Sequence, residues 1–150
     1  ISIVGQNFGA SQYLRVKESY YKAIIYGTVI MIIAGSIIFL SADRIVSIFT
    51  NDVVVMSYGT SYLKISALIF PAYPIYFISN GFFMALKKAS YAMNLNIIRN
   101  VLLPIPTIFF ANFIGGSYKD FFWSYCLFNW IFVILLITFV SIYIKNKLNS

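Results

Sequence analysis

Six side chains between residues 66 and 84 have the types and the spacing to bind a small apolar molecule. They recur every three or four residues, so on a helix they would share one face: Ser66, Phe70, Tyr73, Phe77, Asn80 and Met84. Aromatic rings and a methionine sulfur suit a hydrophobic cation. The same face could instead pack against neighbouring helices, with Asn80 hydrogen-bonded to one of them.

Two prolines lie within the same stretch. Pro71 and Pro74 lack a backbone N–H, so they predict a kinked or loosened helix. The carbonyl groups that a kink frees need partners, and broken helices in transporters often line water-filled cavities. We therefore expect a substrate cavity beside this stretch.

Arg99 lies before a second pair of prolines, Pro104 and Pro106. An ionisable group at membrane depth is costly, which makes it a candidate functional residue. Alternatively, its long side chain reaches the membrane surface, because Lys88 lies only about ten residues before it. The candidate residues of the substrate cavity are therefore Tyr73, Phe77, Asn80, Met84 and Arg99.

Other residue types limit the chemistry that the chain can perform. It contains no histidine and one cysteine, Cys126, which excludes a Cys–His or Ser–His catalytic pair and a Cys–His metal site within it. We expect neither an enzyme nor a bound metal or other cofactor. The carboxylates all fall in predicted loops or at span ends: Glu18, Asp43, Asp52 and Asp120. A relay of sodium or protons inside a membrane needs an acidic residue, and this chain alone does not supply one.

The composition is that of a membrane protein. The 150 residues are 61% hydrophobic and 10% charged, with a mean hydropathy of +0.85, whereas soluble domains carry about 25% charged residues. The net charge of +7 would suggest nucleic acid in a soluble protein. Here the basic residues separate long apolar runs, so we expect no nucleic-acid partner and interpret them as orientation signals.

Four uncharged or nearly uncharged stretches are long enough to cross a bilayer, since roughly 20 helical residues cover a ~30 Å hydrocarbon core. They predict transmembrane spans at 23–42, 65–86, 90–114 and 121–144. Residues 1–14 form a short, polar stretch that resembles the end of a helix. We expect this helix to stop near Gly9, because glycine accepts the left-handed conformation that ends helices. The predicted fold is thus an all-α polytopic bundle of four spans plus the tail of another helix.

The connections between spans carry further signals. Asp52 and its neighbours offer capping oxygens for a helix that begins at Val53. The chain starts without a methionine, which predicts a piece of a larger protein. One set of span ends carries seven basic residues: Arg15, Lys17, Lys22, Lys87, Lys88, Lys145 and Lys147. The other set carries only Arg44 and Lys119, so we expect the Arg15–Lys22 loop and the C-terminus to be cytoplasmic.

Four segments, in chain order, resemble transporters of the multidrug and toxic compound extrusion (MATE) family. Residues 4–10 are similar to the end of its eighth helix, and residues 49–52 to the extracellular connection after the ninth helix. Residues 80–88 are similar to the end of the tenth helix and the basic turn that follows it, and the set Asn96, Arg99 and Pro104 is similar to the eleventh helix. The first segment contains four motif residues: Gly5, Gln6, Asn7 and Gly9.

The resemblance implies two six-helix bundles that export substrates by alternating access. The chain would supply the end of helix eight and helices nine to twelve, and its partners would be the lipid bilayer, the N-terminal half of the transporter and a small-molecule substrate. Some branches of the family carry an acid about eight positions before the glycine that matches Gly81. Tyr73 stands there in this chain, so we expect the sodium or proton to bind in the other half.

The expected function is that of a secondary active antiporter of the plasma membrane. It would export organic cations or other amphipathic compounds in exchange for sodium or protons. A flippase for lipid-linked oligosaccharides, from the same superfamily, is the first alternative. It would need several cavity cations to hold a pyrophosphate, for which only Arg99 and Lys64 are available. A structural membrane subunit is the second alternative.

Overall fold

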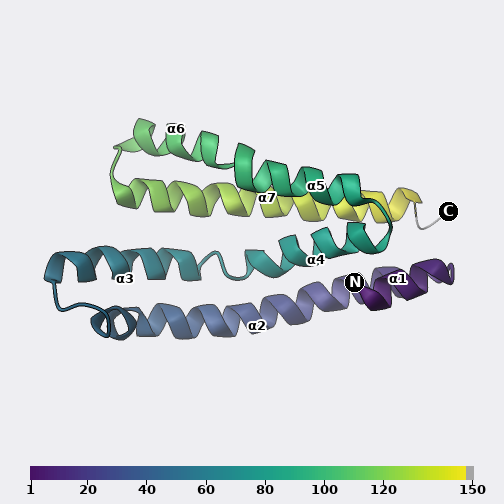
Figure 1. Cartoon of the computed structure of the whole chain (residues 1–150), viewed down its shortest axis with the longest axis horizontal. Helices are drawn as coiled ribbons and strands as arrows, with labels where there is room; N and C mark the ends of the chain where they lie inside the picture. Colours follow the sequence, from purple (N-terminus) through teal and green to yellow (C-terminus); the bar gives the residue numbers. More distant parts are fainter. Residues whose placement is uncertain (148–150) are drawn as a thin grey trace.

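The computed structural model describes residues 1–147, and this part of the chain folds into helices without a strand. Seven α-helices and one π-helical turn, η1, follow one another along the sequence: α1 Ser2–Gly9, α2 Tyr13–Ser47, α3 Val53–Ala67, α4 Ala72–Ala85, α5 Ala89–Ile97, η1 Ile98–Leu102, α6 Pro104–Ile114 and α7 Tyr118–Lys147. Figure 1 shows them as an elongated bundle in which α2, α3–α4, α5–α6 and α7 each run along the long axis, in alternating directions.

The first and last long helices extend beyond the predicted spans 23–42 and 121–144. At about 1.5 Å per residue, the 35 residues of α2 are much longer than the hydrocarbon core requires. The prediction of a loop at Arg15–Lys22 is wrong, because these residues form the first turns of α2. Buried Val16 and Tyr20 hold those turns against the bundle, and Lys22 pairs with Glu18 at 2.7 Å.

The predicted span 65–86 consists of two helices that meet at an angle. α3 and α4 form a pair bent by 52°, so the predicted kink is present but breaks the helix at residues 68–71. Pro71 has no N–H to continue the helical ladder. Within the break, the Leu68 carbonyl accepts a hydrogen bond from Trp130 Nε1 of α7 at 3.2 Å. The span also begins earlier than predicted, at Val53.

Asp52 explains that earlier start. Its carboxylate accepts hydrogen bonds from the backbone N–H groups of Val54 and Val55 at 2.8 and 3.0 Å. These groups have no partner inside the helix, so the carboxylate caps α3 as predicted. The cap fixes the point at which the chain leaves the loop after α2.

The third passage contains a π-helical turn in its middle. The Leu103 N–H donates to the Ile98 carbonyl at 2.8 Å, five residues back, which widens the helix just before Pro104. Residues 89–114 together are long and apolar enough to cross a membrane. The passage begins at Ala89, close to the predicted start at Ser90, and places Arg99 inside the π-helical turn.

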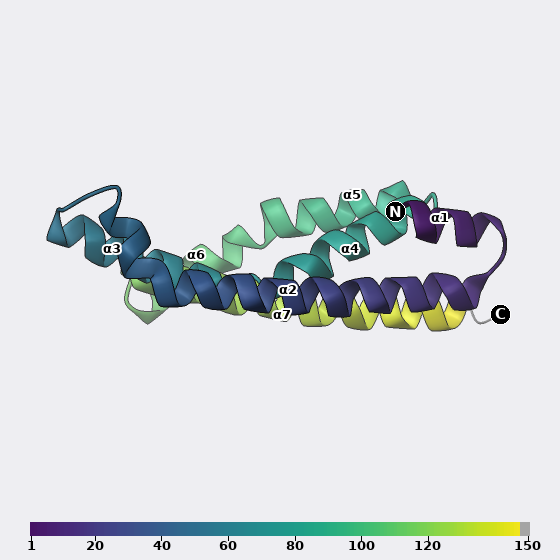
Figure 2. The ribbon, with the colours of Figure 1, turned by 90° about the horizontal axis from the view of Figure 1, so that it is seen from below.

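α1 is short and packs beside α2 and α4 (Figure 2). It ends at Gly9 as predicted, but glycine does not supply the left-handed residue: Ser11, with φ 56°, does so. The reversal comes two residues later because Ala10 still continues the hydrogen-bonding pattern, with its N–H bonded to the Gln6 carbonyl. Near Gly5, an added Cβ would lie 3.8 Å from the Ala85 carbonyl oxygen, so α1 reaches the end of α4.

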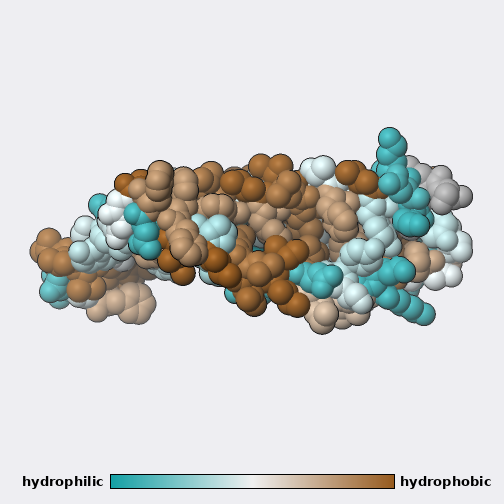
Figure 3. All heavy atoms as spheres, turned by 90° about the horizontal axis from the view of Figure 1, so that it is seen from above, coloured by the Kyte–Doolittle hydropathy of each residue, from teal (hydrophilic) through white to brown (hydrophobic). Residues whose placement is uncertain are grey.

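The two ends of the bundle differ in charge. The start of α2, the α4–α5 turn and the end of α7 lie together (Figure 1), and they carry the seven basic residues named above. The opposite end carries Arg44 and Lys119 with three aspartates: Asp43, Asp52 and Asp120. Figure 3 shows apolar residues over the middle of the molecule and hydrophilic ones gathered toward the basic end. In the described residues, three helices, or four counting the bent pair as one, meet the requirements for a membrane span.

Candidate functional site

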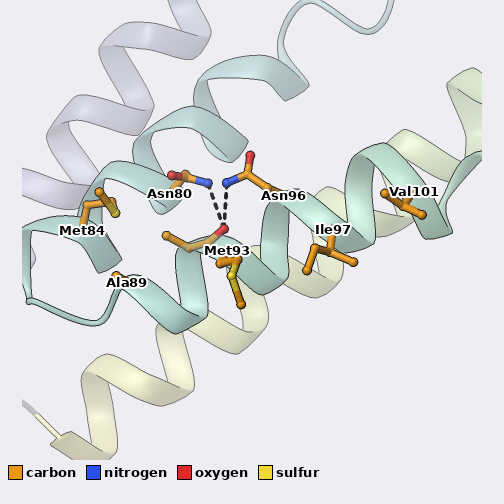
Figure 4. Close-up of a pocket in the computed structure, with 8 residues that line it drawn as sticks. Asn80, Met84, Ala89, Met93, Asn96, Ile97 and Val101 are labelled. Carbon is orange, nitrogen blue, oxygen red and sulfur yellow. Dashed lines mark hydrogen bonds between the residues drawn. The ribbon is translucent and has the colours of Figure 1, made fainter.

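The α4–α5 pair brings two asparagines together over one backbone carbonyl. The Nδ2 groups of Asn96 and Asn80 donate to the Ala92 oxygen at 2.8 and 3.3 Å, as Figure 4 shows. The side-chain oxygen of Asn96 accepts a hydrogen bond from the Tyr76 hydroxyl. Asn80 is thus bonded to a neighbouring helix, and the cluster joins α4 to α5 by polar contacts.

A groove of about 480 Å³ lies beside this polar cluster. Both helices contribute to its walls, which combine amide groups, two methionine sulfurs and small apolar side chains: Asn80, Met84, Ala89, Ala92, Met93, Asn96, Ile97 and Val101. The flexible methionines can adapt to ligands of different shape, whereas the amides supply direction. The groove can therefore hold an amphipathic molecule.

Arg99 lies over the aromatic face of α4. Its Cζ is 4.0 Å from the ring centroid of Tyr76, 4.9 Å from that of Tyr73 and 5.7 Å from that of Phe77. Such contacts stabilise a guanidinium by roughly 0.5–2 kcal/mol, more when water is excluded. The side chain is partly buried and is directed at α4.

Helical spacing explains this direction. Arg99 follows Asn96 by three residues, so the two side chains share the face that meets α4. A π-helical turn surrounds Arg99: Pro104 has no N–H to give to the Asn100 carbonyl, and the widened turn shifts the register of the residues that follow it. Single π-helical turns are frequent at functional sites.

A second hollow, of about 420 Å³, lies along α3 and α4. Its walls include three further members of the predicted face and aromatic residues from the start of α7: Ser66, Phe70, Tyr73, Phe122 and Tyr125. Tyr73 belongs to this hollow and also touches Arg99. The predicted stripe thus becomes two hollows with a cation between them.

The structure places all five cavity candidates along this line. Tyr73 and Phe77 contact Arg99, whereas Asn80 and Met84 lie in the groove. The motif residues Gly5, Gln6, Asn7 and Gly9 lie apart from the groove, in α1. The Asn7 side chain donates to the Ile3 carbonyl of the same helix at 2.9 Å.

Sequence reasoning missed Tyr76 and the groove wall that α5 and η1 form. Tyr76 lies three residues after Tyr73 and four before Asn80, so helical spacing could have identified it. The wall shows an equally regular signal, because its members recur every fourth residue: Ala89, Met93, Ile97 and Val101. Their apolar types concealed it among other membrane-facing residues.

Within residues 1–147, no cluster of three histidine, cysteine, aspartate or glutamate side chains could hold a metal ion. The groove and the second hollow contain neither a carboxylate nor a thiol. Their amides, hydroxyls and aromatic rings bind ligands without covalent chemistry. The arrangement is that of a binding surface.

Comparison with known families decides the identity of this bundle. The family model MatE matches residues 1–110, from α1 into α6. The chain belongs to the MatE family. MatE proteins are membrane transporters rather than enzymes, and the apolar helices described above make this chain a multi-pass membrane protein. No curated protein and no solved structure gave a significant match to the chain.

The matched residues include both hollows of the site except the α7 wall. Asn80, Asn96 and Arg99 all fall within the MatE match, as do the motif residues of α1. α7 lies after the matched residues, and its Trp130 donates a hydrogen bond to the Leu68 carbonyl in the break of the α3–α4 span. The site of this MatE chain is therefore built mostly from the part that defines the family.

Proposed function

We propose that this chain is part of a secondary active antiporter that exports amphipathic compounds across the plasma membrane in exchange for sodium or protons. The observation that carries the proposal is the broken α3–α4 span, whose residues line both hollows and contact Arg99. Transporter sites commonly form where discontinuous helices line a cavity. Amphipathic compounds suit this site, because apolar side chains and a few polar groups line both hollows.

Alternating access needs a second bundle to move against this one. We infer that the N-terminal half of the transporter supplies that bundle and covers the groove between α4 and α5. The substrate would then lie between the halves, with Asn80 and Met84 on its surface. The exposed apolar side chains of α2 and α6 would meet lipid or the other half.

A flippase for lipid-linked oligosaccharides is supported less well. Such a protein needs several cavity cations for a pyrophosphate, and the site contains Arg99. Lys64, the other candidate, forms an ion pair with Asp43 at 2.9 Å near the opposite end of the bundle. One cation in the site therefore favours a smaller substrate.

The test is transport by the complete protein that contains this chain. The purified protein is reconstituted into proteoliposomes that are loaded with a fluorescent amphipathic dye. It should export the dye against the dye's concentration gradient when an inward sodium or proton gradient is imposed. Vesicles without a gradient, and vesicles with residues 1–150 alone, are the controls and should show no uphill export. Dye export that does not depend on either gradient would overturn the antiporter proposal. Flipping of a lipid-linked oligosaccharide, without dye export, would favour the alternative.

A further inference from the structure

The guanidinium of Arg99 has unused hydrogen-bonding capacity. Arginine carries five N–H donors, yet within residues 1–147 none of those of Arg99 makes a hydrogen bond or an ion pair with another side chain. Its contacts in this part of the chain are the three rings of Tyr73, Tyr76 and Phe77. A guanidinium can stack on a ring by its face while the N–H groups, which lie in its plane, stay available.

The carboxylates of the chain do not reach Arg99. Glu18, near the start of α2, pairs with Lys22, and Asp43, near its end, pairs with Lys64 of α3. Asp52 caps α3, and Asp120 accepts a hydrogen bond from the Ser117 N–H at 3.0 Å. A positive charge in a membrane interior is stabilised best by an anion, and the described residues provide only aromatic rings.

We propose that Arg99 binds an anionic group, such as a carboxylate or a sulfonate, of the exported amphipathic compound. The inference rests on the proposed export function and names its substrate class. The anionic group would lie against the donor edge of the guanidinium, where arginine can hold two oxygens at once. The apolar body would occupy an adjoining hollow, either the groove with Met84 and Met93 or the hollow beside Tyr73.

This geometry separates the proposed substrate from an organic cation and from an inorganic anion. A cation would gain from the rings but would lie a few ångströms from the like charge of Arg99, which costs energy where the dielectric constant is low. An inorganic anion would gain from Arg99 but would leave the apolar hollows unfilled. An organic anion or a zwitterion satisfies both features.

The test compares two dyes that share a xanthene ring system, the anionic carboxyfluorescein and the cationic rhodamine 6G. Their binding to the purified full-length protein in zwitterionic nanodiscs is measured by fluorescence anisotropy. Arg99→Gln should weaken binding of the anionic dye by about tenfold to a hundredfold, because a hydrogen bond to a charged group contributes about that factor to an affinity. The cationic dye should bind equally or more tightly. Arg44→Gln, an exposed position at the far end of α2, is the matched control and should change neither.

Arg99→Lys keeps the charge but loses the bidentate donor geometry. It should therefore weaken the binding of the anionic dye alone, and by a smaller factor than Arg99→Gln. This variant decides the question if Arg99→Gln does not fold. The proposal is overturned if the wild type does not bind the anionic dye. It is also overturned if the substitution weakens the binding of both dyes together, or changes the binding of neither. Arg99-dependent binding without gradient-driven export in vesicles would leave the proposal standing and refute the antiporter function instead.

Discussion

Each carboxylate of the chain already has a structural partner. Glu18 and Asp43 form ion pairs with Lys22 and Lys64, while Asp52 caps α3 and Asp120 bonds to the Ser117 N–H. All four lie toward the ends of the bundle, and none of them lines either hollow. They are thus poorly placed to bind a coupling ion that must bias the central site between two access states.

The first prediction concerns these four carboxylates. Neutralising them singly to Asn or Gln in the full-length protein should leave the ion dependence of dye export largely unchanged. The reason is that the coupling carboxylate is expected in the N-terminal half. Export rates are measured against the size of the sodium or proton gradient. Loss of that dependence in any one variant that still folds and binds substrate would place the ion site in this chain.

The residue types of the site were readable from the sequence, but their contacts were not. Tyr73, Phe77, Asn80 and Met84 share a face because of their helical spacing alone. The sequence alone left open whether the Arg99 side chain reaches the membrane surface. The three rings that it contacts lie on another helix, α4, and spacing within its own helix does not reveal them.

Close packing of α2 against the broken span depends on two glycines. A Cβ added to Gly35 would lie 2.8 Å from the Ala67 carbonyl oxygen, and one added to Gly27 would lie 2.9 Å from the Cβ of Pro74. Such small residues let helices approach closely where no hydrophobic effect drives them together. The contacts lie beside the break, so they also hold α3 and α4 at their angle.

Gly35→Ala should therefore destabilise the protein, by about 1–3 kcal/mol, because overpacking forces a backbone shift. Gly9→Ala is the matched control, since an added Cβ there meets no atom within 4 Å. It should leave the free energy of unfolding unchanged or slightly raised. Unfolding is followed by tryptophan fluorescence in mixed micelles. Equal stability of the two variants would show that α2 does not pack as described.

The four long passages and their order followed from hydropathy, whereas the break in the α3–α4 span did so only in part. Pro71 and Pro74 predict a kink, and the structure has one. Its position depends on partners that are distant in sequence, the Trp130 indole and the close approach of Gly35. The early start at Val53 was signalled by the Asp52 cap, although the apolar run alone suggested residue 65.

At the scale of the whole molecule, the uneven charge of the two ends predicts how the protein sits in a membrane. Basic residues are retained on the cytoplasmic side, and here they gather at the end with the α4–α5 turn (Figure 1). We therefore expect the α2–α3 and α6–α7 turns outside the cell. The position predicted for the C-terminus concerns residues 148–150, which lie outside the described part of the chain.

Single cysteines test this orientation in a background without other cysteines. Asn51→Cys and Ser117→Cys, in the two turns of the acidic end, should react with a membrane-impermeant maleimide on intact cells. Ser90→Cys, which is equally exposed but lies at the basic end, is the control and should react only after permeabilisation. The reverse pattern would invert the proposed topology.

The central claim is that the groove between α4 and α5 is part of the substrate path. Cysteines placed singly at Asn96 and Met93, which line the groove, should react in the full-length protein with a water-soluble methanethiosulfonate reagent. A transported dye should slow that reaction severalfold. Cysteines at Ile33 and Phe109, exposed apolar positions of α2 and α6 away from the groove, should show no protection by the dye. If the groove cysteines are unreactive, or react at the same rate with and without dye, the groove does not bind substrate.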